Sequence, residues 1–210
     1  AAMEKLFRGA FPWKRRRPLP PPAPELTSAP PAVRETIEKM DVEQGHLVIG
    51  ARTGITWADD GVFALLFANG ILGGFPHSKL FRNVREREGL AYAAGSSIDN
   101  AKGLMFLNAG IDPEKFEPAV RVIREQLDAL QQGEISDEEM DKTRASLVNR
   151  VRSREDSPSS KVAWFHELNT YGRRMTAGEA VARYEGLSRE DVMAAARRVT
   201  LDTIYFLTRP

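Results

Sequence analysis

The sequence predicts an α+β domain in which helices cover one face of an antiparallel-dominated sheet. Three observations lead to this fold class. Short alternating or apolar runs, which are typical of strands, occur early, in the middle and at the end of the chain. Longer segments with helix-capping signals lie between them. The resulting order is two strands, two helices, two strands, five helices and one strand, which groups the strands instead of alternating each with a helix.

The first strands and the first helix are predicted between residues 34 and 72. Residues 34–40 alternate polar and apolar side chains and residues 45–51 are mostly apolar, so together they form two strands or a bent strand pair. Asp59-Asp60 is expected to cap a helix over 61–72. That helix is apolar on nearly every side, which is typical of a buried core helix, and the Gly73-Gly74 pair is expected to end it with close packing.

A second helix and a hairpin follow. Residues 78–88 combine apolar and charged positions at helical spacing, so they predict an amphipathic helix. Strands are predicted over 91–98 and 103–111, joined by Asp99-Asn100-Ala101-Lys102. Because Asp and Asn side chains bond the local backbone, they favour turns, and the two strands are predicted to form an antiparallel hairpin.

Five helices and a closing strand account for the rest of the chain. Asp112, as a cap, and Pro113, in the first turn, start a helix with one apolar stripe, which Gly133 ends. Ser136-Asp137-Glu138-Glu139 is a capping box that opens a longer helix to about Arg152. The remaining elements are a helix through Trp164 and Leu168, two short helices that open at the capping boxes Thr176-x-x-Glu179 and Ser188-x-x-Asp191, and a strand over 202–208.

Composition narrows the class of protein. The chain has 210 residues, 42% of them hydrophobic, which is enough for one large domain or two small ones with a sizeable core. A net charge of +1 gives no global attraction to nucleic acid or to acidic partners. The absence of cysteine excludes disulfides and cysteine-based zinc sites and fits a cytoplasmic location. Since no apolar run approaches about 18 residues, we expect no transmembrane helix.

Residues 1–32 differ in composition from the rest of the chain. They contain the basic run Lys14-Arg15-Arg16-Arg17, and seven of the fourteen residues from Pro18 to Pro31 are proline. Such a segment is stiff and extended, so we interpret residues 1–32 as a linker and residues 33–210 as the folded domain. A polyproline ligand and a nucleic-acid-binding arm are alternatives. The second predicts binding that weakens steeply with salt, although a four-residue basic run is weak evidence for it.

The stretch from Gly73 to Tyr92 says most about function. It combines a glycine break, an amphipathic helix, a Gly-Leu turn and a strand that opens with an aromatic residue. Arg85 lies near the end of the helix, and Tyr92 lies seven positions later, just inside the strand. A helix-to-strand corner can aim both side chains at one point, where a guanidinium and a phenol would donate hydrogen bonds to the carbonyl oxygens of an extended peptide. The structural alternative is a solvated arginine and a half-buried packing tyrosine.

The run Leu80-Phe81-x-x-x-Arg85-x-x-x-Gly89-Leu90-Ala91-Tyr92 resembles the insulinase/pitrilysin family of zinc metallopeptidases, which includes the mitochondrial processing peptidase. The resemblance extends from Val33 to the C-terminus, and it matches the C-terminal domain of a half-molecule, which carries no zinc. In this family an Arg and a Tyr at this spacing lie across the cleft from the zinc and are thought to hold the substrate and stabilise the transition state. The resemblance implies these roles for Arg85 and Tyr92, in an inactive, substrate-binding domain.

The zinc motif of this family is absent from the sequence. In that motif, H-x-x-E-H, two histidines on one helix face hold the ion and the glutamate activates water. The histidines of this chain, His46, His77 and His166, are far apart. We therefore expect no cofactor in this chain and zinc in a partner domain or subunit. His166 is expected to pack beside Trp164 and Leu168. His77, at the start of the second helix, is a candidate substrate-binding residue, although a solvated or capping histidine also fits its position.

Two functions stay open at this stage. The first is the substrate-binding half of a zinc metalloendopeptidase, whose partners would be a peptide substrate and a zinc-bearing H-x-x-E-H domain or subunit. The second is a non-catalytic structural or interaction subunit, since the family contains members that have lost proteolysis. The presence of Arg85 and Tyr92 at the expected spacing favours the first. Neither function requires nucleic acid or a membrane, and the chain alone is not expected to be an active enzyme.

Overall fold

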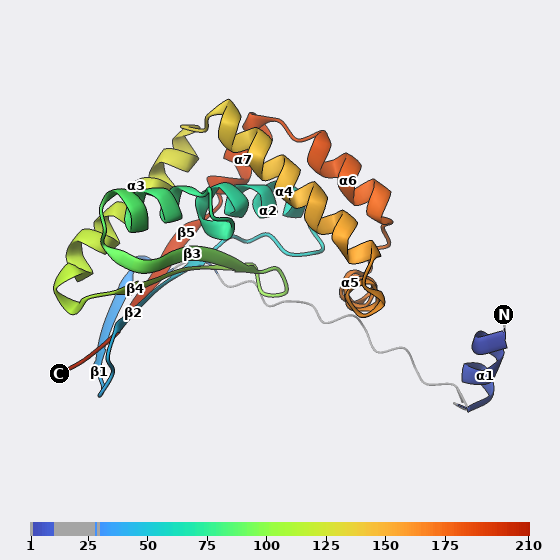
Figure 1. Cartoon of the computed structure of the whole chain (residues 1–210), viewed down its shortest axis with the longest axis horizontal. Coiled ribbons are helices and arrows are strands. Elements are labelled where there is room, and N and C mark those ends of the chain that lie inside the picture. Colours follow the sequence, from blue (N-terminus) through green and yellow to red (C-terminus); the bar gives the residue numbers. More distant parts are fainter. Residues whose placement is uncertain (1, 11–27, 29) are drawn as a thin grey trace.

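A five-stranded sheet forms the centre of the molecule. The computed structural model describes residues 2–10, 28 and 30–210. Its strands are β1 (Arg34–Lys39), β2 (Gly45–Arg52), β3 (Ala91–Asp99), β4 (Leu104–Ile111) and β5 (Thr200–Thr208). Their order in the sheet is β1-β5-β2-β4-β3, and these strands pair antiparallel except for β1 with β5. Helices cover one face of the sheet (Figure 1), so the predicted α+β class is confirmed.

The helices differ in detail from the predicted ones. The first, α1 (Ala2–Ala10), was not predicted from the sequence. The core helix α2 (Val62–Asn69) continues directly into the π-helical segment η1 (Gly70–Gly74), and a second π-helical segment, η2 (Phe81–Arg87), precedes β3. The later helices are η3 (Pro113–Lys115), α3 (Phe116–Gln132), α4 (Asp137–Glu155), α5 (Pro158–Thr170), α6 (Ala177–Glu185) and α7 (Arg189–Ala196).

The two N-terminal strands do not pair with each other, although they are adjacent in the sequence. β5, the last strand of the chain, lies between them, parallel to β1 and antiparallel to β2. The alternative of a bent strand pair is therefore wrong, and the alternative of two separate strands is confirmed. In this position both backbone edges of β5 are hydrogen-bonded to neighbouring strands. Such pairing is needed because β5 carries the buried side chains Ile204 and Phe206, and buried backbone groups require partners.

Helix capping follows the sequence signals at three of the predicted sites. Ser136, Thr176 and Ser188 each accept a hydrogen bond from the backbone N–H three residues later, and the side chain at that later position bonds back. These reciprocal bonds satisfy backbone donors that the first helical turn leaves free. The starts of α4, α6 and α7 were thus predictable from local sequence alone.

The predicted cap at Asp59-Asp60 is wrong. Asp59 Oδ2 instead accepts hydrogen bonds from the backbone N and the Oγ1 of Thr56, at 2.8 and 2.9 Å, within the preceding turn. Gly61 occupies the cap position of α2, without a side-chain cap bond. Short polar side chains such as Asp can accept hydrogen bonds either from a turn or from the first turn of a helix. Here the Asp59 carboxylate accepts those of the turn before α2.

Close packing explains the glycine pair that was predicted to end the first helix. A Cβ on Gly73 would lie 2.4 Å from the backbone N of Ser96 on β3, which is far inside normal contact distance. Gly74 is the last residue of the helical segment, and Phe75 is extended. The glycines therefore allow η1 to touch the sheet directly and bring the start of the functional motif onto β3.

The hydrophobic core lies between the sheet and the helices. Ile49, Leu107 and Ile204 from the sheet and Leu65 and Phe67 from α2 are each at most 2% exposed. Burial of one side chain of this size contributes roughly 1.5–3 kcal/mol, before the cost of ordering it. The same layer anchors η2 and β3, which carry the residues of the functional motif.

The predicted linker falls mostly outside the described residues. The basic run 14–17 and nearly all of the proline-rich stretch 18–31 belong to the part of the chain that the structure does not describe. The division into residues 1–32 and 33–210 accordingly stays a prediction. Within the described ranges, no helix is both long and apolar enough to cross a bilayer.

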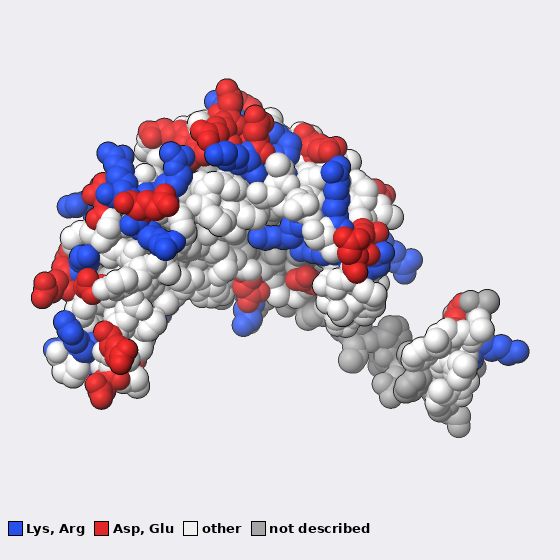
Figure 2. All heavy atoms as spheres, viewed as in Figure 1, with Lys and Arg blue, Asp and Glu red and all other residues white. Residues whose placement is uncertain are grey.

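Charged side chains of both signs lie intermingled over the helices and along the rim of the molecule (Figure 2). The hollowed side below the helices is occupied mainly by uncharged side chains in this view. This distribution agrees with the net charge of +1 and leaves no large region of a single sign on the visible face.

Candidate functional site

The corner between η2 and β3 is fixed by its backbone. The N–H of Glu88 donates to the carbonyl of Asn83 at 3.1 Å, and the N–H of Leu90 donates to the carbonyl of Val84 at 2.9 Å, so the chain wraps around the end of η2. Gly89, between them, has a φ of +57°, a left-handed conformation that disfavours any residue with a Cβ. The Gly-Leu turn of the motif thus has a conformational role: it directs the chain from the helix into the strand.

Arg85 lies on the exposed side of η2. Its guanidinium carbon lies 4.6 Å from the centre of the Phe81 ring, one turn earlier, in a cation–π contact. Its neighbour in η2, Val84, is buried in the core. Stacking on Phe81 restricts the guanidinium to one orientation and leaves its N–H edges open to solvent or to a ligand.

Tyr92 occupies a bulge at the start of β3. Ala91 lies opposite Ile111 and Ala93 lies opposite Gly110, so Tyr92 is the extra residue between two regular positions. Its side chain is 61% exposed. A bulge re-aims a side chain away from the regular alternation of a strand, and here it turns the phenol toward the start of the next helical segment.

The Tyr92 hydroxyl donates a 2.9 Å hydrogen bond to Oδ1 of Asp112. This bond raises the pKa of Tyr92 above its usual value and lowers the pKa of Asp112. Asp112 was predicted as a helix cap, and it does occupy the cap position of η3, but its side chain makes no cap bond. The predicted position of the cap is therefore confirmed, and the bond from Tyr92 makes Asp112 a site residue that the sequence did not reveal.

Lys115 ties the two halves of this corner together. Its Nζ donates to the carbonyl of Gly89 at 3.0 Å and lies 3.4 Å from Oδ2 of Asp112. The ammonium therefore links the turn that follows Arg85 to the carboxylate that holds Tyr92. The corner therefore carries a guanidinium, a phenol and an ammonium, whose donors can bind oxygen atoms of a ligand, and a carboxylate that is the partner of the last two.

His77 has its contacts elsewhere. Its Nε2 lies 3.1 Å from Oγ1 of Thr143 on α4, and its ring stacks on Phe75 with centroids 5.3 Å apart. Burial is the largest cause that lowers the pKa of His77; Lys142 adds to this effect and Glu139 opposes it. The histidine joins the segment that follows η1 to α4, whereas Arg85 and Tyr92 have other partners. A substrate-binding role for His77 stays a prediction.

The described residues do not fit a zinc site. No group of three or more His, Cys, Asp or Glu side chains within them could hold a metal ion. His46 lies on β2, His77 precedes η2 and His166 lies on α5. His166 is exposed, so the prediction that it packs beside Trp164 and Leu168 is wrong. Those two side chains are buried, and each lies two residues from His166, on the other face of α5.

Comparisons with known proteins identify the family. The family model described as "Peptidase M16 inactive domain" matches residues 2–147. A "Probable inactive metalloprotease YmfF" of Bacillus subtilis is 38% identical over 174 residues, which cover 83% of this chain and 41% of the relative. An uncharacterized zinc protease of Streptomyces coelicolor is 29% identical over 202 residues, covering 95% of this chain and 43% of the relative. The chain thus spans about two fifths of these relatives.

Solved structures have the same fold. A conserved protein from Enterococcus faecalis superposes with a TM-score of 0.83 at 34% identity, covering 88% of this chain and 44% of that one. A peptidase M16 inactive domain from Pseudomonas fluorescens gives 0.76 at 19% identity, covering 89% and 46%. The second shows the fold alone. Together with the matched family model, these findings show that the chain belongs to the peptidase M16 inactive domain family, the inactive-domain branch of the zinc peptidases that its motif resembles.

Proposed function

We propose that this chain is the substrate-holding half of a zinc metalloendopeptidase, in which Arg85 and Tyr92 bind the backbone of an extended peptide. The observation that supports it is their common corner, where both side chains are exposed and present hydrogen-bond donors on a surface anchored to the core. A peptide carbonyl oxygen gains negative charge when its carbon is attacked, so donors fixed beside it favour the transition state.

The two side chains would have different tasks. The Arg85 guanidinium is permanently charged and carries several N–H donors, so it can hold a carbonyl oxygen throughout the reaction. Tyr92 has one O–H, which Asp112 accepts in the absence of a ligand. A substrate oxygen would compete with Asp112 for this donor. The exchange leaves no carboxylate without a partner, because Lys115 remains beside Asp112.

Zinc would come from another part of the assembly. The described residues have no metal-holding group, and the chain spans only 43% of a relative that is named as an uncharacterized zinc protease. We therefore place the H-x-x-E-H motif in a further domain or a separate subunit. When bound there, zinc would activate water and polarise the scissile carbonyl. The residues of this chain would orient the peptide and stabilise its oxygen.

A non-catalytic role is the second candidate. It is favoured by the name of the relative that is 38% identical, a probable inactive metalloprotease. In such a protein the same corner would bind an extended peptide without hydrolysis, or would serve only as a surface of an assembly. Retention of Arg85 and Tyr92 at the motif spacing argues for the peptidase role.

Reconstitution distinguishes the two candidates. The chain alone and the chain combined with a zinc-bearing H-x-x-E-H domain or subunit are incubated with a fluorogenic peptide library, and bound zinc is counted in parallel. The proposal expects hydrolysis only where the zinc-bearing half is present. Peptide binding without hydrolysis in every combination, or no zinc in any of them, would instead support the non-catalytic subunit.

A further inference from the structure

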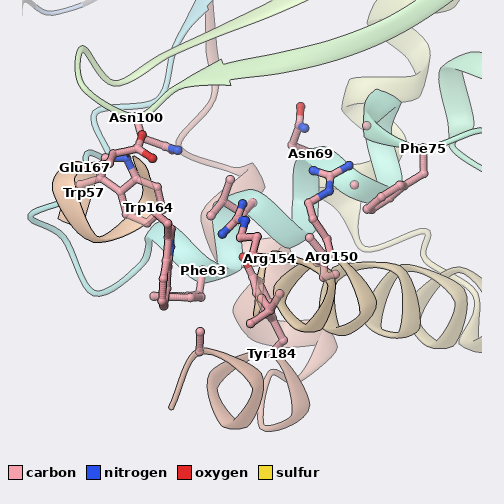
Figure 3. A pocket seen from close by; sticks show the side chains of 16 residues that line it. Trp57, Phe63, Asn69, Phe75, Asn100, Arg150, Arg154, Trp164, Glu167 and Tyr184 are labelled. Atoms are coloured by element: carbon pink, nitrogen blue, oxygen red, sulfur yellow. Dashed lines mark hydrogen bonds between the residues drawn. The ribbon is translucent and has the colours of Figure 1, made fainter. Parts of the chain in front are cut away.

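A second candidate site lies away from the corner of Arg85 and Tyr92. It is a cavity of about 160 Å³ between α2, α4, α5 and α6, closed at one end by the β3–β4 turn (Figure 3). A volume of this size accommodates one benzene-sized group. Its walls are rich in aromatic side chains, contributed by Trp57, Phe63, Phe75, Trp164 and Tyr184.

Two arginines of α4 point into this cavity. Arg150 and Arg154 are four residues apart, so they leave the helix on the same face, and Figure 3 shows both guanidinium groups directed into the space between Phe75 and Trp164. The Arg150 guanidinium carbon lies 4.7 Å from the Phe75 ring centre, and that of Arg154 lies 5.8 Å from the Trp164 ring centre. Each planar group is thus oriented by an aromatic ring and keeps its N–H donors free.

Neither guanidinium has an ion-pair or hydrogen-bond partner among the described residues. Two other basic side chains nearby do have partners. Lys142, on the same helix, pairs with Glu138 at 2.6 Å, and Lys161 pairs with Glu155 at 3.0 Å. What distinguishes Arg150 and Arg154 is that both unpaired guanidinium groups line one cavity, where an anion would complete their hydrogen bonding.

Three further polar side chains of the lining restrict which ligands the cavity can bind. Glu167 lines the cavity, but its Oε1 is already engaged by Nε1 of Trp57 at 2.8 Å, so the lining retains an excess of positive charge. The Oδ1 of Asn100 is buried and lacks a hydrogen-bond partner in the described structure. Burial raises the pKa of Tyr184 to about 12, although Arg154 and Arg150 act in the opposite direction, so this phenol stays neutral.

We propose that this cavity binds a carboxylate carried on an apolar group, with Arg150 and Arg154 holding the carboxylate and the aromatic walls holding the apolar part. A planar carboxylate matches the edge of a guanidinium. A phosphate carries more charge, which Glu167 would oppose, and it makes no use of the apolar walls. The chemistry is shared by the C-terminal residue of a peptide and by a free organic acid. A peptide terminus has, in addition, an N–H beside its carboxylate that could bond to Asn100.

Isothermal titration calorimetry on the full chain tests the proposal with four probes. They are N-acetyl-phenylalanine, the amide of the same compound, 3-phenylpropionate and inorganic phosphate. The proposal expects N-acetyl-phenylalanine to bind and its amide, which lacks the carboxylate, to bind about tenfold more weakly or not at all. Weaker binding of 3-phenylpropionate would assign the site to peptide termini, and equal binding would assign it to free acids.

The variants Arg150→Gln and Arg154→Gln should each weaken binding of N-acetyl-phenylalanine by about tenfold. Arg152→Gln is the matched control, because this exposed arginine lies on the same helix between them and does not line the cavity. Arg154→Lys keeps the charge but loses the planar fork, and serves if Arg154→Gln lowers the melting temperature. Binding of phosphate or of the amide as tight as that of the acid, binding unaffected by either variant, or no binding of any probe would overturn the proposal.

Discussion

Tyr92 donates its only hydroxyl hydrogen to Asp112, which lies twenty residues later, at 2.9 Å. This bond joins the first residues of β3 to the segment that leads into α3. It has a consequence for function, because the proton that would stabilise a substrate oxygen is held by a carboxylate when no substrate is present. Asp112 therefore orients the Tyr92 hydroxyl and raises its pKa.

Replacement of this carboxylate should lower the pKa of Tyr92. The hydrogen bond to Asp112, followed by the negative charge of this carboxylate, disfavours ionisation of the phenol, so Asp112→Asn is expected to bring the pKa of Tyr92 down toward the ordinary value of tyrosine. The measurement is a pH titration of the Tyr92 ring-carbon NMR signal, assigned with Tyr92→Phe. A pKa that does not change, or one that rises, would show that the bond to Asp112 is not formed in solution.

Gly73 should tolerate no side chain, because η1 touches β3 at this point. In Gly73→Ala the new Cβ would lie 2.4 Å from the backbone N of Ser96, so helix and strand must separate. We expect a loss of about 1–3 kcal/mol in the free energy of unfolding, measured by urea denaturation.

Gly178→Ala is the matched control for that measurement. Gly178 lies in α6, and the nearest side-chain atom to its Cβ position is 4.0 Å away. Alanine should be neutral there or should stabilise the helix by about 0.5–1 kcal/mol. Equal effects of the two substitutions would contradict the close contact between η1 and β3.

Asp202 should make the free energy of unfolding depend on pH under acidic conditions. The Thr203 hydroxyl, followed by Arg34 and Arg52, lowers the pKa of Asp202 to about 2. A folded-state pKa below the unfolded value of about 3.9 stabilises the fold above that value, and the stabilisation is lost as pH falls toward 2. The difference in unfolding free energy between the wild type and Asp202→Asn should therefore shrink between about pH 4 and pH 2. A difference that stays constant over this range would refute the role of the carboxylate.

Local signals in the sequence predicted local structure well. The capping boxes at Ser136, Thr176 and Ser188 and the hairpin turn at Asp99 were predicted correctly, because each rests on bonds between residues at most three positions apart. The pairing of β1 with β5 could not be predicted in this way. It joins Arg34 to Thr203, across most of the chain, and the choice of neighbour depends on the packing of the whole sheet.

The candidate site was predictable only in part, because some of its contacts also join residues that are far apart in the sequence. The spacing of Arg85 and Tyr92 identified the corner, but the partner of Tyr92 did not follow from the sequence. Asp112 precedes Pro113, a pattern typical of a helix start, and only the fold brings its carboxylate to the phenol. The cavity arginines had one sequence signal, two arginines four residues apart on one helix, but the aromatic walls come from elements that only the tertiary structure assembles.

Turnover of the complete peptidase assembly tests the proposed function most directly. With the zinc-bearing half present, Arg85→Ala and Tyr92→Phe should each lower kcat by about 100–1000-fold, the usual cost of one lost oxyanion donor, without changing the melting temperature. Arg87→Ala is the control: Arg87 is another exposed arginine of η2, paired with Glu88 at 3.6 Å, and its loss should leave kcat near that of the wild type. Turnover close to the wild-type value in both Arg85→Ala and Tyr92→Phe would contradict the assignment of this corner to the reaction.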